Sequence, residues 1–396
     1  MYNSNVVNWE NVEMPRNIQG APVRGEDLFD RARELAKLET CLEIGSALLL
    51  APRRYGKTSI LQELVRRDPR RRRYFDLYHV SRASSFVTEI AADTAGPVAR
   101  VRDWIADVLG KTLDRIESVQ IDEIAVELRR SLEREDRWSD ALLQMLSTFG
   151  ANDVLVFDEF PVMLKAIHDK DRQEAIDLLR LLRHVRQADG APRFIFAGST
   201  SLPRLVADIG AVDAINDLTV VSLDPFDETV ALALLAAVFE TEQVPATAGV
   251  CRAIVSCVGP EVPFFLHLLA GHVKAEWRDY AKMPTPRRIR ERLYQESMLG
   301  PEGRVPVEDF RARLDRVYTP AERDVAFVLL GELSRERGGL TMAGLRGRVV
   351  DHGLDDALVE RVLALLADDF YIAPSQGWYR FFNRFMADWW RRYFAD

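Results

Sequence analysis

The chain has 396 residues and a net charge of −8, with 47% hydrophobic and 29% charged residues. This length predicts two or three domains, and the composition excludes a disordered chain, while the acidic balance argues weakly against broad nucleic-acid binding. No apolar run is long enough to cross a membrane and the first residues carry no secretory signal, so we expect a cytoplasmic protein whose three cysteines are reduced, buried thiols: Cys41, Cys251 and Cys257.

The first part of the chain predicts a helix, a strand and a second helix. Apolar residues recur at helical spacing from Leu28 to Leu42, and Ala47 to Leu50 is an apolar run typical of a buried strand. A turn with Gly56-Lys57-Thr58 follows, and Ile60 to Val65 starts the next helix. This order favours a phosphate-binding loop, because backbone N–H groups and the positive helix end attract phosphates.

In such a loop Lys57 reaches the β- and γ-phosphates of a nucleoside triphosphate, and the Thr58 hydroxyl coordinates Mg²⁺. One position departs from the pattern, because Ala51 stands where the first glycine is expected and alanine tolerates a positive φ less well. The alternative is a chance Gly-Lys-Thr in an ordinary turn. The predicted nucleotide-binding residues of the loop are Pro52, Arg53, Arg54, Tyr55, Gly56, Lys57, Thr58 and Ser59.

A second apolar strand, Asp153 to Phe157, ends in two carboxylates, Asp158 and Glu159. A continuous apolar strand fits a parallel sheet covered on both faces, where ligands bind at the carboxyl edge. We expect Asp158 to hold Mg²⁺, directly or through water, and Glu159 to polarise the attacking water. Lys57 and Glu159 are thus predicted catalytic residues. The alternative is an ordinary solvated turn.

A third strand, Arg193 to Ala197, ends in Gly198-Ser199-Thr200-Ser201. These hydroxyl groups could contact the γ-phosphate or the lytic water, and Ser199 is our third catalytic candidate. They could equally cap the next helix. A further strand is predicted from Tyr74 to Val80, followed by a long helical region up to about Phe149.

The arginine-rich segment from Arg66 to Arg73 has two interpretations. Arginines favour a helix C-terminus, where they offset the dipole, and Pro69 would then stop the helix. The other interpretation is a patch that binds phosphate or acidic groups.

The alternation of strands and helices predicts an α/β core over residues 1–223, with a largely parallel sheet between helices. Residues 224–286 then predict a helical lid, in which Asp227 caps one helix and Pro263 begins another. Residues 287–396 predict a charged linker and a winged-helix domain. Its expected elements are helices Pro320–Arg335, Met342–Val350 and Asp355–Asp368, a hairpin of Phe370–Ile372 and Trp378–Phe381, and an aromatic helix, Asn383–Phe394.

Taken together, these residues resemble the archaeal-type ATPases of the STAND class, relatives of the AAA+ proteins, over most of the chain. Two departures are Ala51 and the lack of an arginine in residues 214–218, which leaves an arginine finger between subunits unassigned. The segments that carry the resemblance are Phe29-Asp30-Arg31 with Glu34-Leu35, Pro52 to Ser59, Phe157 to Phe160, Gly198 to Leu202, Gly259 to Leu266, and Trp389 to Tyr393.

The resemblance implies a slow ATPase that cleaves ATP to ADP and phosphate with Mg²⁺, and whose lid closes on the nucleotide. It also implies that Pro263, at a helix start, packs near the nucleotide. We expect a nucleotide-dependent switch that acts through a protein partner or by self-association. The alternative is an ATP-regulated DNA-binding protein that uses the winged helix, although the third helix of that domain is acidic and would be repelled by DNA.

Overall fold

The computed structural model describes residues 15–95, 128, 132, 137–198 and 201–395. These residues form two compact units. The sheet unit comprises Arg31–Ala51 and Ile60–Leu223, and the helical unit comprises the residues up to Asp30, Pro52–Ser59 and the residues from Asp224 onward. The loop before α2 therefore has its contacts in the helical unit, although it continues directly from a strand of the sheet unit.

The sheet unit contains a five-stranded parallel sheet in the order β2-β3-β4-β1-β5. Because all strands run the same way, their carboxyl ends share one edge, and β4 lies between β1 and β3. The predicted α/β class with a parallel sheet is confirmed. The strands are β1 (Ala47–Leu50), β2 (Arg72–Asp76), β3 (Val154–Asp158), β4 (Arg193–Gly198) and β5 (Thr219–Ser222).

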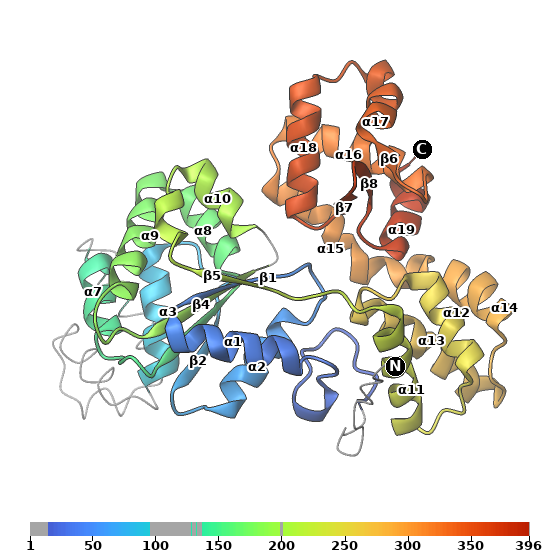
Figure 1. Ribbon diagram of the computed structural model, residues 1–396, viewed down its shortest axis with the longest axis horizontal. Helices are drawn as coiled ribbons and strands as arrows, with labels where there is room; N and C mark the ends of the chain where they lie inside the picture. The colour runs from blue at the N-terminus through green and yellow to red at the C-terminus, as the bar shows by residue number, and fades with distance from the viewer. Residues whose placement is uncertain (1–14, 96–127, 129–131, 133–136, 199–200, 396) are drawn as a thin grey trace, which may run out of the picture. The chain divides into compact units, whose positions relative to one another are not determined.

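Helices cover both faces of this sheet: α1 and α2 lie on one face, and α8 to α10 lie on the other (Figure 1). Phe157 of β3 packs at the centre of an aromatic core, with ring centroids 5.2–5.7 Å from those of Phe75, Phe86, Phe194 and Phe196. The helices of the unit are α1 (Ala32–Ile44), α2 (Lys57–Arg67), α3 (Ala83–Ala95), α7 (Trp138–Leu146), α8 (Phe160–His168), α9 (Arg172–Arg186) and α10 (Leu202–Ile209).

Two predictions for this unit need correction. The strand predicted from Tyr74 to Val80 runs instead over Arg72–Asp76, because its ladder with β3 begins at Arg72 and a turn at Leu77–Val80 follows it. Cys41 is partly exposed, since the buried stripe of α1 is Leu35, Leu38 and Leu42; Cys251 and Cys257 are buried as expected. Most of the helical region predicted before Phe149 lies outside the described residues.

The arginine-rich segment has contacts that fit its structural interpretation. Helix α2 ends at Arg67, before Pro69, and both Arg66 and Arg67 pair with Glu63 in its last turns. Arg72 belongs to β2 and pairs with Glu39 at 2.6 Å.

The helical unit begins with three helices, of which α13 starts at Pro263 as predicted. The segment from Arg287 to Tyr318, predicted as a linker with helical stretches, is helical almost throughout. Prolines at Pro286 and Pro301 open helical turns there, and Ile289, Leu293 and Met298 are buried. The elements are α11 (Glu228–Thr241), α12 (Ala248–Val258), α13 (Pro263–Tyr280), α14 (Pro286–Arg288), a π-helix (Ile289–Met298) and α15 (Pro301–Val317).

The C-terminal part has three helices, a three-stranded antiparallel sheet in the order β6-β8-β7, and a last helix. Strand β7 begins at Ile372 rather than Phe370, because Phe370 adopts a left-handed φ of 60° that ends α18. The elements are α16 (Pro320–Arg335), β6 (Leu340–Thr341), α17 (Met342–Val349), α18 (Asp356–Asp368), β7 (Ile372–Ser375), β8 (Trp378–Phe381) and α19 (Arg384–Phe394).

The aromatic helix α19 packs on this C-terminal part through its two buried tryptophans, Trp389 and Trp390. The Trp390 ring lies 5.2 Å from Phe327 of α16 and 6.4 Å from Phe381 of β8. The aromatic stripe is therefore core, as expected for apolar residues at helical spacing.

Candidate functional site

The candidate phosphate loop joins β1 to α2, and Lys57 is the first residue of that helix. Gly56 has a φ of 87° and Arg54 a φ of 68°, so the left-handed turns fall next to Lys57. Ala51 is buried, and it is not among the described residues with positive φ. The departure from glycine at this position therefore causes no backbone strain in the loop.

Inside the loop, Lys57 is only 6% exposed and its Nζ lies 3.5 Å from the Pro52 carbonyl oxygen. The Ser59 hydroxyl accepts a hydrogen bond of 3.0 Å from the Val23 backbone N–H, which links the N-terminal segment to the loop. Lys57, Thr58 and Ser59 all lie in the first turn of α2. Their backbone N–H groups are thus among those that a helix leaves without intrahelical acceptors.

At the sheet edge, β3 ends in Asp158, a carboxylate that is 2% exposed. The Tyr74 hydroxyl of the neighbouring strand β2 donates to Asp158 Oδ2 at 2.9 Å, and the Glu159 N–H donates to Oδ1 at 3.0 Å. These two donors hold the carboxylate in place. Sequence reasoning missed Tyr74, and only the pairing of β2 with β3 could have indicated it.

Glu159 follows directly and has left-handed backbone, with φ 53° and ψ 28°, at the N-cap of α8. A non-glycine residue in this region is strained, and such strain gathers at functional sites. The next strand approaches α8 closely as well, because a Cβ on Gly198 would lie 2.5 Å from Pro161. Glycine is thus required where β4 ends.

The third catalytic candidate, Ser199, lies outside the described residues, as does Thr200. The next residue, Ser201, caps α10 through a hydrogen bond of 3.4 Å from the Arg204 N–H. One of the two interpretations of this hydroxyl group, helix capping, therefore holds for Ser201.

The two predicted magnesium ligands, Thr58 and Asp158, fit that ion in chemical type. A hydroxyl and a carboxylate are hard oxygen donors, and Mg²⁺ in nucleotide sites takes one or two protein oxygens beside waters and phosphates. Among the described residues, no group of three or more His, Cys, Asp or Glu side chains is placed to hold a metal by itself. The donor set therefore suits a metal that arrives with a nucleotide.

The segment predicted to carry the lid motif, from Gly259 onward, forms a loop between α12 and α13. Gly259 has a φ of 79°, and Pro263 begins α13, so Phe264 lies in its first turn. The Arg54 guanidinium of the phosphate loop stacks over the Phe264 ring at 4.5 Å. The phosphate loop and α13 are thus in direct contact within the helical unit.

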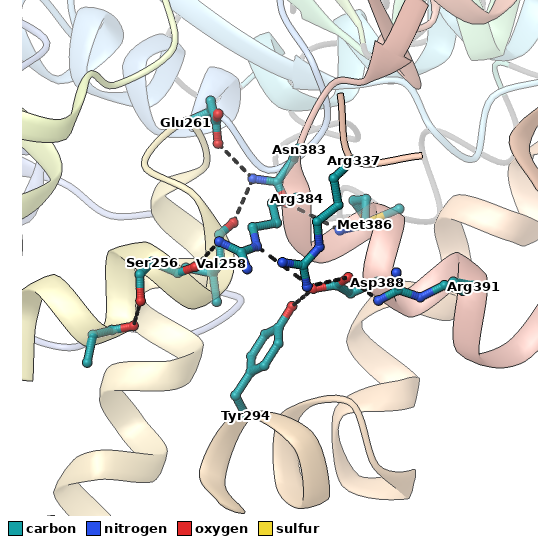
Figure 2. Close-up of polar contacts among 11 residues, drawn as sticks. Ser256, Val258, Glu261, Tyr294, Arg337, Asn383, Arg384, Met386, Asp388 and Arg391 are labelled. Atoms are coloured by element: carbon teal, nitrogen blue, oxygen red, sulfur yellow. Dashed lines mark hydrogen bonds and ion pairs between the residues drawn. The ribbon is translucent and has the colours of Figure 1, made fainter. Parts of the chain in front are cut away.

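A polar network that sequence reasoning missed joins the start of α19 to the end of α12 and the loop between α12 and α13 (Figure 2). The Asn383 amide donates to the Val258 carbonyl at 2.8 Å and to Glu261 Oε2 at 3.0 Å. Burial raises the pKa of Glu261, and the bond from Asn383 partly offsets this. A Cβ on Gly259 would lie 2.3 Å from Glu261 Oε2 and 3.0 Å from Asn383 Nδ2, so glycine is needed for this approach.

The same helix carries a second polar group, buried Asp388. Its Oδ2 accepts a hydrogen bond of 2.8 Å from the Tyr294 hydroxyl, and its Oδ1 pairs with Arg391 at 2.6 Å. Burial and the Asp388 carboxylate raise the pKa of Tyr294, so the phenol stays protonated and donates. The bond from Tyr294 joins α19 to the π-helix, and the pair with Arg391 lies within α19 itself (Figure 2).

Among the solved structures to which this chain is similar, two align with nearly its whole length. The Walker-type ATPase PABY2304 of Pyrococcus abyssi is 17% identical with a TM-score of 0.63, and the alignment covers 95% of this chain and 98% of that one. The sheet unit has the P-loop NTPase fold. The ORC2 protein of Aeropyrum pernix, solved as ADPNP–ADP complexes, is 13% identical with a TM-score of 0.54 and coverage of 97% and 94%.

At these identities the likeness shows the fold. No protein-family model and no curated protein sequence matches this chain. In the part of the chain that the structure describes, no helix combines the length and the apolar character that spanning a membrane requires.

Proposed function

We propose that this protein binds ATP and hydrolyses it slowly to ADP and phosphate, as a nucleotide-dependent switch of the STAND class. One observation carries the proposal: a P-loop NTPase sheet combines a Gly56-Lys57-Thr58 turn after β1 with Asp158 and a strained Glu159 after β3. Because β1 and β3 are parallel, both segments leave the sheet at its carboxyl edge, where open α/β sheets bind ligands.

Each residue then has a role set by its chemistry. Backbone N–H groups of the loop and the Lys57 ammonium bind the phosphates, and Thr58 and Asp158 hold Mg²⁺. When bound, Mg²⁺ neutralises charge on the phosphates. Glu159 orients and polarises the attacking water, and Ser199 contacts the γ-phosphate or this water.

The switch acts through the rest of the chain. In our proposal residues 1–223 form the ATPase core, 224–286 the lid and 287–396 a linker with a winged-helix domain. The order α16, β6, α17, α18, β7, β8 supports the winged-helix assignment, because it supplies three helices and a β-hairpin. Pro263 places the first turn of α13 toward the nucleotide, and the output is contact with a protein partner or self-association in the cytoplasm.

DNA binding through the winged helix is the alternative function, and charge disfavours it. Arg361 of α18 pairs with Glu322 at 3.0 Å, and Arg346 of α17 pairs with Glu360 of α18 at 2.6 Å. These arginines are already engaged by carboxylates, and base-reading helices need basic side chains directed to the phosphates and bases. A protein surface is therefore the favoured partner.

Replacing Lys57 tests the binding step. Lys57→Ala removes the ammonium group that contacts the β- and γ-phosphates, and a charge-assisted contact of this kind contributes about 1.5–3 kcal/mol, so we expect nucleotide affinity to fall at least about tenfold. Isothermal titration with Mg-ATP and Mg-ADP measures this. Lys165→Ala is the matched control, because Lys165 pairs with Asp169 on the surface of α8. Equal affinity of Lys57→Ala and wild type would refute the assignment of the loop.

A further inference from the structure

The two residues before Gly56 direct their side chains into the helical unit. Tyr55 is 1% exposed, and its ring lies 5.5 Å from that of Phe382 at an interplanar angle of 58°. Arg54 stacks on Phe264 of α13. Because the Tyr55 side chain is buried in aromatic contacts, it cannot also reach a nucleotide, so it serves another purpose than phosphate binding.

Phe382 lies between the end of β8 and the start of α19. Its backbone N–H donates to the Tyr371 carbonyl at 3.0 Å, and its ring lies 6.2 Å from Phe370, next to the start of β7. The following residue, Asn383, caps α19 and donates to Val258 at the end of α12 and to Glu261 in the loop that follows. One short segment therefore contacts the phosphate loop, the hairpin and the lid.

Little empty space remains among the side chains around Phe382. A cavity of about 20 Å³, which is room for about one water molecule, is lined by residues that include Pro52, Tyr55, Phe265, Phe382 and Met386. Packed interiors of this kind shift between discrete arrangements rather than deform gradually. A change in the loop conformation at Tyr55 would therefore move Phe382 and the residues next to it.

We infer that Tyr55 and Phe382 form a relay that transmits the nucleotide state of the phosphate loop to the hairpin β7–β8 and to α19. Tyr55 is a positioning residue in this relay, and Arg54 on Phe264 makes a parallel contact with the lid helix. The inference rests on the proposed function, because it requires a nucleotide at the loop. It adds the route by which the bound nucleotide reaches the partner-binding part of the chain.

Hydrogen exchange followed by mass spectrometry tests the relay, with and without a non-hydrolysable ATP analogue and Mg²⁺. In the wild type, nucleotide should change exchange in residues 370–394 by about fivefold or more, the usual lower range for coupled sites. Tyr55→Leu and Phe382→Leu should each remove most of this difference, and the double variant should add nothing, because both break the same link. Phe382→Leu, which lies outside the phosphate loop, should still bind the analogue within about tenfold of wild type.

Two controls separate a relay from simple destabilisation. Tyr55→Phe keeps the ring and should keep the response. Trp378→Leu changes an aromatic residue of the same hairpin that is 49% exposed, and it should also keep the response. Unchanged nucleotide response in Tyr55→Leu, or faster exchange to the same extent with and without nucleotide, would overturn the relay alone. A wild type that binds no nucleotide would overturn the relay and the proposed function together.

Discussion

At the scale of single residues, the candidate site is marked by backbone conformation as much as by residue type. Arg54 and Glu159 both have left-handed φ, 68° and 53°, which costs about 1–3 kcal/mol for a side chain with a Cβ. Sequence identified both residues as site candidates but could not predict their strain, because φ depends on how the neighbouring elements pack.

A second residue-scale feature is His267 of α13, which contacts the N-terminal segment. Its Nδ1 lies 2.9 Å from the Asn17 side-chain amide, and the Gln19 amide donates to its carbonyl oxygen at 3.2 Å. Burial lowers the pKa of His267 to about 4, although the nearby carboxylates of Glu242 and Asp27 oppose this. The imidazole is therefore neutral in the folded protein at neutral pH.

This predicts a pH dependence of stability. Between the ordinary histidine pKa near 6.5 and about 4, the unfolded chain binds a proton that the folded protein does not, so stability falls as pH falls through this window. The loss over this window is about 3 kcal/mol. Urea unfolding at several pH values measures the free energy of unfolding. In His267→Asn this free energy should no longer fall through this pH window. His79→Asn, at an exposed histidine, is the control and should keep this fall. A wild-type profile that is flat, or identical in His267→Asn, would contradict the account.

At the scale of elements, sequence predicted most helices and strands because their signals are local. The predicted helix from Pro320 to Arg335 matches α16 at both ends. Its start can be identified from residue types, because Thr319 and Glu322 form a capping box there. The helical content of residues 287–318 was underestimated, because its buried residues are spaced among many charges and their burial depends on distant partners. The bond from Tyr294 to Asp388, 94 residues apart, is one of these.

Helix α19 gives a prediction at this scale. Asp388→Ala leaves the buried Tyr294 hydroxyl without its acceptor, and an unsatisfied buried group costs about 1–3 kcal/mol, so α19 should open more readily by that amount. Hydrogen exchange of α19 amides measures the change. Asp324→Ala removes an exposed carboxylate that pairs with Arg323, and should cost less than about 1 kcal/mol. Equal effects of the two substitutions would show that Asp388 does not hold the helix.

For the whole molecule, the order of the strands in the sheet could not be predicted from the sequence. Strand-helix alternation predicts a parallel sheet, yet nothing local specifies that β4 lies between β1 and β3. That order brings Asp158 and the end of β1 to one edge with Gly198 between them. Nor could sequence indicate that Pro52–Ser59 contacts α13 and the C-terminal part, because residues such as Tyr55 and Phe382 are more than 300 positions apart.

We propose that this fold hydrolyses ATP and that Glu159 activates the attacking water. The most direct test measures ATP turnover and ATP binding together in wild type and in Glu159→Gln, which keeps the size of the side chain but removes its basic carboxylate. We predict slow turnover in the wild type, at least a tenfold loss in Glu159→Gln, in the usual range for a general base, and unchanged ATP affinity. Equal turnover in the two proteins, or a wild type that binds no ATP, would contradict the account.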